Sequence, residues 1–238
     1  MIRLRDNSSR AKWAVGFIFV AVFTSVISMG SAVMEYFFLD KEILNQDELD
    51  ANNLRQQVVL FLDIAVSLIA GIVFIRWFRR AYFNLHKLTN SLSHGEGWAA
   101  GAWFTPIVNL FRPYQIMKEL WDETLSLLSS NDEPEVSSAK TGVKMLGFWW
   151  ALWIISGVLA RIGSRMTDDN SSIEEYQAAD IINISSDGLN VLAGVLLIGI
   201  IRKYAILESR LNNVSNDRFE DFGKSESDEN WESMPEVS

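Results

Sequence analysis

Four long stretches of the chain are almost free of charged residues. Trp13–Met34 contains none, and three more largely apolar stretches follow at 56–78, 143–162 and 181–203. The hydrocarbon core of a bilayer is about 30 Å thick and a helix rises 1.5 Å per residue, so about 20 apolar residues suffice to cross it. The pattern therefore predicts an all-α protein with a four-helix transmembrane bundle within residues 13–211.

The first apolar stretch has two interpretations. Basic residues precede it, and small residues (Gly30, Ser31 and Ala32) lie near its end, as in a cleaved signal peptide. Its apolar run is longer than the about 7–15 residues of a signal-peptide core. We therefore expect this stretch to be retained as a membrane helix.

The segments between the apolar stretches alternate in charge. Residues 1–12 are basic, as are the segments that follow the second and fourth stretches, whereas 35–55 and 163–180 are acidic. Lys and Arg are enriched in the cytoplasmic loops of membrane proteins. The alternation predicts four crossings with both termini, including the basic segment 1–12, in the cytoplasm.

The longest predicted loop, residues 79–142, has structure of its own. Residues 98–111 are uncharged but too few to cross a bilayer, which indicates an interfacial or re-entrant piece. Pro113 is typical of the first turn of a helix. The sequence thus predicts a cytoplasmic interfacial or re-entrant hairpin over 98–130, in which Asn109 caps the second helix or bonds to exposed backbone.

The carboxyl end is acidic and poor in large apolar residues. Asn212–Ser238 holds eight acids against Arg218 and Lys224, which gives −6 of the net charge of −9. Such a segment buries too little apolar surface to offset the entropy of ordering. We predict a disordered acidic tail over 212–238.

Arginine and aromatic residues alternate where the second predicted helix ends. This pattern can bind nucleic acid by stacking, but beside a membrane helix the Arg side chains meet lipid phosphates and Trp77 sits at the headgroup level. We favour membrane anchoring and expect no nucleic acid partner. The expected interfacial shelf consists of Arg76, Trp77, Arg79, Arg80, Asn84, Trp98, Trp103, Phe104, Pro106, Asn109, Arg112, Pro113 and Trp121.

The same region resembles the signature of a bacterial family known as domain of unknown function 4328. The resemblance is densest over Phe74–Trp121 and extends to about Arg210. It implies a multi-pass protein of the inner (plasma) membrane of a bacterium, and it carries no established activity, ligand or catalytic residue. The matching motifs are Trp77-x-x-Arg80-Ala81-x-x-Asn84, Trp98-Ala99, Trp103-Phe104-x-Pro106-x-x-Asn109-Leu110-x-x-Pro113, Leu120-Trp121 and the aromatic run Phe148–Trp153.

Ionisable residues inside the predicted helices need partners, because each costs roughly 2.5–3.5 kcal/mol on insertion scales. Asp63 and Asp187 lie at similar depths, Arg161 ends the third helix on the same side, and Asn183, Asp187 and Asn190 share one helix face. We expect these five residues to form an intramembrane polar cluster. It either holds the helices together by hydrogen bonds or binds a proton, an ion or a small solute.

Several kinds of chemistry are excluded. The chain has no cysteine, so disulfides and thiolate ligands cannot form. It has no Gly-rich phosphate loop, no Gly-x-Ser-x-Gly elbow and no His-Glu-x-x-His helix. We therefore expect no enzyme activity, catalytic residue, cofactor or metal site.

Together these patterns predict a non-enzymatic, membrane-embedded interaction or accessory protein. Its expected partners are the lipid bilayer and either another protein or further copies of the same chain. The alternative is a small transporter, or a proton- or ion-linked channel subunit, that uses Asp63, Asp187 and Arg161.

Overall fold

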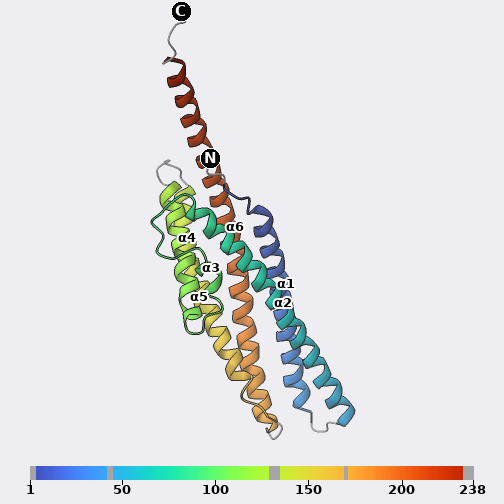
Figure 1. Ribbon diagram of the computed structural model, residues 1–238. Helices are drawn as coiled ribbons and strands as arrows, with labels where there is room; N and C mark the ends of the chain where they lie inside the picture. Colours follow the sequence, from blue (N-terminus) through green and yellow to red (C-terminus); the bar gives the residue numbers. More distant parts are fainter. Residues whose placement is uncertain (1–3, 42–44, 129–134, 169–170, 233–238) are drawn as a thin grey trace, which may run out of the picture.

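The computed structural model describes residues 4–41, 45–128, 135–168 and 171–232, without the side chains of 135–141 and 214–232. All regular elements within these ranges are helical (Figure 1). In chain order they are α1 (Ser8–Leu39), α2 (Gln46–His86), α3 (Trp98–Gly101), the short 3-10 helix η1 (Val108–Leu110), α4 (Arg112–Leu128), α5 (Glu135–Gly163) and α6 (Ile173–Glu232).

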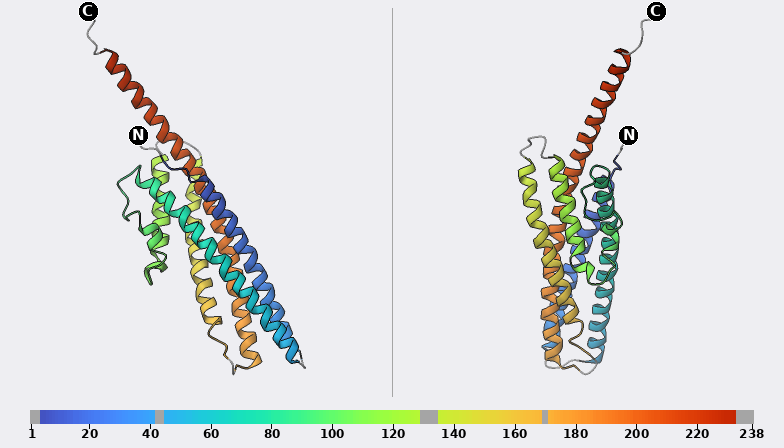
Figure 2. Two further views of the ribbon diagram at one scale, coloured as in Figure 1. Left: turned by 45° about the vertical axis from the view of Figure 1, so that its right-hand side comes forward. Right: turned by 60° about the vertical axis from the view of Figure 1, so that its left-hand side comes forward.

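Four long helices form the body of the molecule. α1 packs against α2 and α6, and α6 also packs against α5 (Figure 2). At the α1–α6 contact Gly194 lies directly against Val22, where a larger residue would collide, so the two helices approach closely. α1, α2, α5 and α6 each contain a stretch long and apolar enough to cross a membrane, which confirms the four predicted long apolar helices.

The helices are longer than the apolar stretches that predicted them. α2 begins at Gln46, where the Asn45 side chain accepts a hydrogen bond from the Glu48 backbone N–H at 2.8 Å. α6 begins beside a reciprocal cap, in which Ser172 and Glu175 each bond the other's backbone N–H. Apolar composition marks only the lipid-facing part of a helix, whereas these caps set where helical bonding starts.

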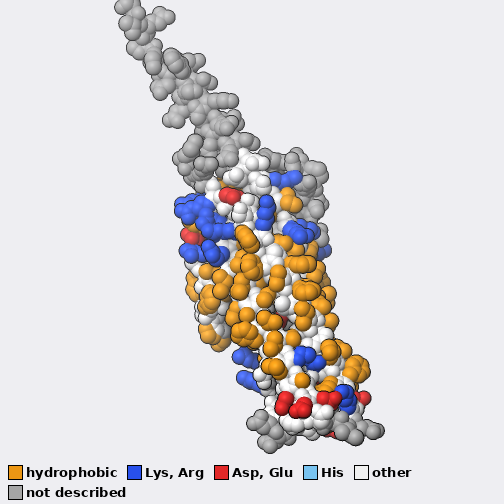
Figure 3. All heavy atoms as spheres, turned by 90° about the vertical axis from the view of Figure 1, so that its right-hand side faces the viewer, with side chains coloured by type: hydrophobic (Ala, Val, Ile, Leu, Met, Phe, Trp, Pro, Cys, Tyr) orange, Lys and Arg blue, Asp and Glu red, His pale blue; other side chains and the backbone are white. Residues whose placement is uncertain are grey.

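Hydrophobic side chains form a belt around the middle of the bundle (Figure 3). Lys and Arg gather at one end of this belt and acids at the other, and we call these the basic end and the acidic end. Phe19 of α1 and Phe61 of α2 are among the large apolar residues that are mostly exposed on the long helices. In water such an exposed apolar surface would promote aggregation, whereas in lipid it is surrounded by apolar acyl chains.

The bridging segment, Trp98–Leu128, lies between α2 and α5 towards the basic end. It comprises α3, η1 and α4, and it contacts α2 on one side and α5 and α6 on the other. α4 begins at Arg112, so the helix start predicted at Pro113 is confirmed. Residues 129 and 130, the end of the predicted hairpin, lie outside the described part of the chain.

Aromatic rings hold the bridging segment in place. Trp77 of α2 is fully buried, with its ring centroid 5.9 Å from that of Tyr204 on α6. Tyr204 in turn lies 5.8 Å from Trp121 of α4. Trp77, which was expected at the headgroup level, and its neighbour Phe78 are enclosed by protein, because α4 and α6 cover this face of α2. Ring pairs of this kind contribute about 0.5–1.5 kcal/mol each beyond their buried area.

The tip of the bridging segment is a tight turn. Ile107 has a φ of 66°, and the Val108 N–H donates to the Pro106 carbonyl at 2.7 Å, which is the hydrogen bond of a strained three-residue turn. The Trp150 indole N–H of α5 donates to the Leu110 carbonyl at 3.0 Å and ties the turn down. Asn109 does not supply the predicted bond through its side-chain oxygen, which is buried and has no hydrogen-bond partner in the described structure.

Glu119 of α4 connects the bridging segment to the loop that precedes it. Its carboxylate accepts from the Tyr82 hydroxyl and the Ser93 N–H, both at 2.6 Å, and lies 3.0 Å from His94 Nδ1. Burial opposes the charged carboxylate, but the hydrogen bonds from Tyr82, Ser93 and His94 outweigh it and lower the pKa of Glu119. The ionised form is therefore the one that fastens α4 to α2.

A second polar connection closes the basic end. The carboxylate of Glu208 on α6 accepts from Asn84 of α2 at 2.8 Å and from Asn7 at 3.0 Å. Asn84 also bonds the backbone N–H and carbonyl of Arg5, at 3.1 and 2.8 Å. One asparagine thus joins the residues before α1, the end of α2 and α6.

The carboxyl segment departs from the prediction of a disordered tail. α6 continues as helix to Glu232 and projects beyond the rest of the molecule (Figure 1). Residues 212–232 contain one glycine and no proline, so the helical backbone can satisfy its own hydrogen bonds without a packed partner. The remaining residues of the predicted tail, 233–238, lie outside the described structure.

Replacing Asn84 should loosen the basic end. In Asn84→Ala the buried Glu208 carboxylate loses a partner and the Arg5 backbone loses two hydrogen bonds, so we expect the free energy of unfolding to fall by roughly 1–3 kcal/mol. Asn90→Ala, at an exposed loop position, is the matched control. Thermal unfolding of the detergent-purified variants measures both, and equal stability of the two variants would contradict the role of Asn84.

Glu119 makes the stability of the bridging segment depend on pH. Because its pKa is lowered on folding, its contribution is complete above the usual value of 4.5 and is lost as the pH falls through the folded-state pKa. We expect Glu119→Gln to lower stability by roughly 1–3 kcal/mol at about pH 7 and by less at about pH 3, because the contribution declines below 4.5.

Asp122 on the same helix is the control for this experiment. Burial raises the pKa of Asp122, so its charge opposes folding and Asp122→Asn should not destabilise the protein at neutral pH. Thermal unfolding at the two pH values compares the variants. A loss of stability in Glu119→Gln that does not change with pH would refute the role of the ionised carboxylate.

Candidate functional site in a groove between α2 and α5

The four long helices do not close around a common axis. α2 and α5 lie on opposite sides of the α1–α6 pair, and a partly open cavity of about 250 Å³ remains between them. Its lining is mainly apolar. The lining residues are Ile18, Ala21, Val22, Ser25, Ser67, Ala70, Gly71, Phe74, Ile75, Trp103, Trp149, Trp153, Asn190, Ala193, Gly194 and Leu197.

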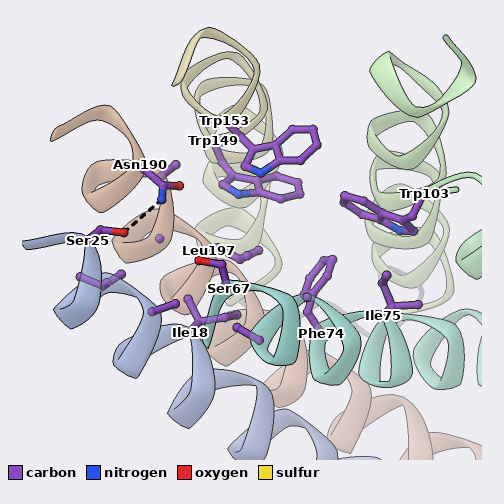
Figure 4. Close-up of a pocket in the computed structure, with 16 residues that line it drawn as sticks. Ile18, Ser25, Ser67, Phe74, Ile75, Trp103, Trp149, Trp153, Asn190 and Leu197 are labelled. Carbon is purple, nitrogen blue, oxygen red and sulfur yellow. Dashed lines mark hydrogen bonds between the residues drawn. The ribbon is translucent and has the colours of Figure 1, made fainter. Parts of the chain in front are cut away.

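Aromatic side chains from three elements surround the groove. Trp149 and Trp153 of α5 lie on one side, Trp103 of the bridging segment faces them, and Phe74 of α2 lies between (Figure 4). The Trp103 ring is edge-on to Phe74 at 5.5 Å and to Trp153 at 5.8 Å. The bridging segment therefore closes the groove towards the basic end.

Small residues and a few neutral polar groups line the other part of the groove. On α2, Ser67 and Gly71 are one helical turn apart, and a Cβ atom added at Gly71 would meet no side chain or neighbouring helix within 4 Å. On the α1–α6 side Asn190 donates to the Ser25 hydroxyl at 3.2 Å (Figure 4). The space beside Gly71 is thus available to a ligand.

The predicted intramembrane cluster begins at this point and is only partly assembled. Asp63 of α2 accepts hydrogen bonds from Thr24 at 2.8 Å and Ser25 at 3.3 Å, both on α1. Through Ser25 it is linked to Asn190, and Asp187 lies near enough to Asp63 to interact electrostatically. Asp63, Asp187 and Asn190 are therefore brought together where α1, α2 and α6 meet.

Asn183 and Arg161 lie away from that group. The Asn183 side chain packs against Gly163 at the end of α5. The face of α6 that carries Asn183 and Asn190 is wide enough to contact two neighbouring helices, so the two asparagines can have different neighbours. Arg161 is exposed, and no ion pair joins it to an acid within the described residues. Arg161 therefore stands apart from the predicted cluster in the described structure.

A further polar cluster lies at the acidic end and was missed from the sequence. Asn52 donates to Glu35 at 2.9 Å, Arg55 donates to Asn52 at 2.6 Å, and Ser31 donates to Gln56 at 3.0 Å. Most of these residues fall outside the apolar stretches, so a search limited to those stretches passes over them. The useful signal was the helical spacing of Asn52, Arg55 and Gln56, which places them on one side of α2.

The predicted interfacial shelf is divided by the fold into a buried and an exposed part. The buried members lie in the contact between α2, the bridging segment and α6, the exposed members face outward, and four members are half-buried. Buried are Trp77, Asn84, Pro113 and Trp121. Half-buried are Arg80, Trp103, Asn109 and Arg112, and exposed are Arg76, Arg79, Trp98, Phe104 and Pro106.

The chemistry available in the groove is that of binding. Its polar groups are those of two serines and one asparagine together with tryptophan indole N–H groups, none of which is ionised at neutral pH. Among the residues whose placement is described, no three His, Asp or Glu side chains lie close enough to hold a metal ion. An apolar ligand is the kind of molecule that this lining favours.

The comparisons with known proteins give one result. The family described as Domain of unknown function (DUF4328) matches residues 40–205, well over half of the chain. No curated protein and no solved structure matches. The matched region runs from the loop before α2 through the bridging segment and α5 into α6, so it contains both walls of the groove. The resemblance seen in the sequence is thereby confirmed: the chain belongs to the DUF4328 family, with four helices that can span a membrane.

Proposed function

We propose that the protein is a non-enzymatic membrane protein that binds the acyl chain of a lipid in the groove between α2 and α5. The observation that carries this proposal is the cavity of about 250 Å³ left between aromatic and small residues. Within a bilayer, packing contacts rather than exclusion of water hold such a chain. The neutral lining supports binding in preference to acid–base chemistry.

The shape of the groove favours an acyl chain over a helix of another protein. Trp103 blocks the end of the groove that a full-length transmembrane helix would have to pass. A flexible chain can bend into the space that remains.

The bridging segment acts in this proposal as a re-entrant hairpin. Trp103 contacts Trp153 of α5. The apolar stretch of α5 begins at Gly142, and Trp153 lies eleven residues further on. At 1.5 Å per residue this is a depth of roughly 16 Å, about half of a 30 Å hydrocarbon core. At the tip, the side chains of Phe104 and Ile107 are 75% and 76% exposed, as suits contact with lipid tails. The internal hydrogen bonds of the turn supply the backbone partners that lipid cannot.

The wider role that we propose is that of an interaction or accessory protein in the plasma membrane of a bacterium. The basic end faces the cytoplasm in this proposal, as positively charged flanks do. The bonds that join Arg5, Asn84 and Glu208 place the amino end and the later part of α6 at that same end, which supports two cytoplasmic termini. The exposed faces of α1 and α2 remain free for a protein partner or a second copy of the chain.

Filling the groove should abolish acyl-chain binding. Gly71→Phe places a ring in the open space beside Gly71, so we expect several-fold less labelling by a phospholipid that carries a diazirine in its acyl chain. Gly16→Phe is the matched control, because Gly16 is exposed on α1, has equal free space and does not line the cavity. Mass spectrometry of the labelled protein in nanodiscs locates the adducts.

The wild-type adducts are expected on peptides that contain Phe74, Trp149 or Trp153, with Gly16→Phe unchanged. Labelling spread evenly over the lipid-facing helices and unaffected by Gly71→Phe would sink the proposal. A photoreactive residue placed at position 153 tests the alternative occupant. If it crosslinks to another protein in cells and gives no lipid adduct, the groove binds a protein and not a lipid.

A transporter or channel subunit remains the second candidate, because the polar chain Asn190–Ser25–Asp63 leads from the groove into the bundle. The hydrogen bonds to Asp63 are satisfied on α1, which supports a structural role at about 0.6–1.7 kcal/mol per interhelical bond. Under the structural role, Asp63→Asn lowers thermal stability.

Reconstituted vesicles separate the two functions. We expect wild-type protein, Asp63→Asn and Asp187→Asn to show the same proton and ion flux as protein-free vesicles. Flux above that background that disappears in either variant, with the variant still folded, would establish transport. Arg161→Gln serves as a control, because that exposed residue lies away from the two acids.

A further inference from the structure

Five arginines converge on one cavity at the basic end. The cavity measures about 300 Å³ and shares no residue with the groove. Its arginines come from the residues before α1, from the first turn of α1 and from the last turns of α2, so the fold assembles them from separate parts of the chain. The lining residues are Arg5, Arg10, Arg76, Arg79, Arg80, Phe83 and Glu96.

Contacts with the rest of the fold position two of these arginines. The Arg5 guanidinium lies 4.5 Å from the centre of the Phe83 ring, and Asn84 bonds both the N–H and the carbonyl of the Arg5 backbone. Arg10 donates from Nη1 to the Arg76 carbonyl at 3.2 Å. These contacts place the guanidinium groups of Arg5 and Arg10 before any ligand is bound, which lowers the entropy cost of binding.

The cavity carries a large excess of positive charge. Glu96 is the one carboxylate in its lining, and it pairs with Arg79 at 3.7 Å, so five guanidinium groups and one carboxylate leave four positive charges. Glu208 lies within electrostatic range of Arg80 but is bonded to Asn7 and Asn84. Even when Glu208 is counted, three positive charges remain.

We propose that this cavity binds a ligand bearing phosphate with at least two negative charges. Planar guanidinium groups match phosphate oxygens by paired hydrogen bonds, and several around one cavity favour a phosphomonoester or a diphosphate over a singly charged diester. The blue side chains of the basic end adjoin the hydrophobic belt (Figure 3). The phosphate can therefore belong to a lipid headgroup or to a soluble molecule.

Binding is tested with full-length protein in nanodiscs. We expect phosphatidic acid, a phosphomonoester lipid, to bind more tightly than phosphatidylglycerol, a phosphodiester. Arg10→Gln and Arg76→Gln should each weaken binding of phosphatidic acid by roughly tenfold. Arg202→Gln removes the same charge from an exposed position of α6 and should leave binding unchanged. Thermal unfolding shows whether each variant is folded.

Inorganic pyrophosphate distinguishes the two sources of phosphate. If pyrophosphate competes with phosphatidic acid and loses affinity in Arg76→Gln, the site accepts soluble phosphates as well as lipid. If phosphatidic acid binds and pyrophosphate does not, the site binds the phosphate of a lipid headgroup and not a soluble phosphate. Equal binding of both lipids, or equal weakening by Arg76→Gln and Arg202→Gln, would show a general response to charge and overturn the proposal. Acyl-chain labelling of the groove does not depend on either result.

Discussion

Interlocked aromatic rings hold the bridging segment between α2 and α5, and the rest of the arrangement follows from this contact. Trp77, Tyr204 and Trp121 connect α2, α6 and α4, while Phe74, Trp103 and Trp153 connect α2, the tip of the segment and α5. Because the segment occupies this position, α2 and α5 are kept apart and the groove stays open. Removing the segment would leave two apolar walls with nothing to separate them.

Polar bonds complement the rings at points where lipid offers no partner. The Trp150 indole donates to the Leu110 carbonyl at the tip of the bridging segment. Glu119 accepts from the Ser93 N–H in the loop before that segment, and Asn84 donates to Glu208 of α6. Packing alone is weakly specific in a bilayer, because lipid tails are as apolar as leucine. The hydrogen bonds therefore select one arrangement among several that would bury similar area.

Much of the fold could be predicted from the sequence because the bilayer imposes a simple rule on length and composition. The four long helices, the helix after Pro113 and the family were all visible in the residues. The starts of α2 and α6 could not be predicted in this way. They depend on capping hydrogen bonds of Asn45 and Ser172, and apolar composition gives no sign of these bonds. The helical continuation of α6 was missed for another reason, because the acidic composition of 212–232 hides a run without proline in which helical bonding can continue.

The candidate site was harder to predict. The grouping of Asp63, Asp187 and Asn190 followed from depth and helical spacing, but Arg161 and Asn183 have other surroundings. The groove itself depends on how far apart α2 and α5 stand, and that distance is a property of tertiary packing around Trp103. The convergence of Arg5 and Arg10 with the arginines of α2 likewise required the position of the amino end.

The bond between Asn7 and Glu208 sets an order of events during synthesis. Its two residues are 201 positions apart in the chain. At about 5–20 residues per second, the amino end waits roughly 10–40 s before its carboxylate partner emerges from the ribosome. The residues before α1 can therefore bond α2 through Arg5 and Asn84 well before Asn7 meets Glu208, and the connection to α6 forms only when the last helix has been made.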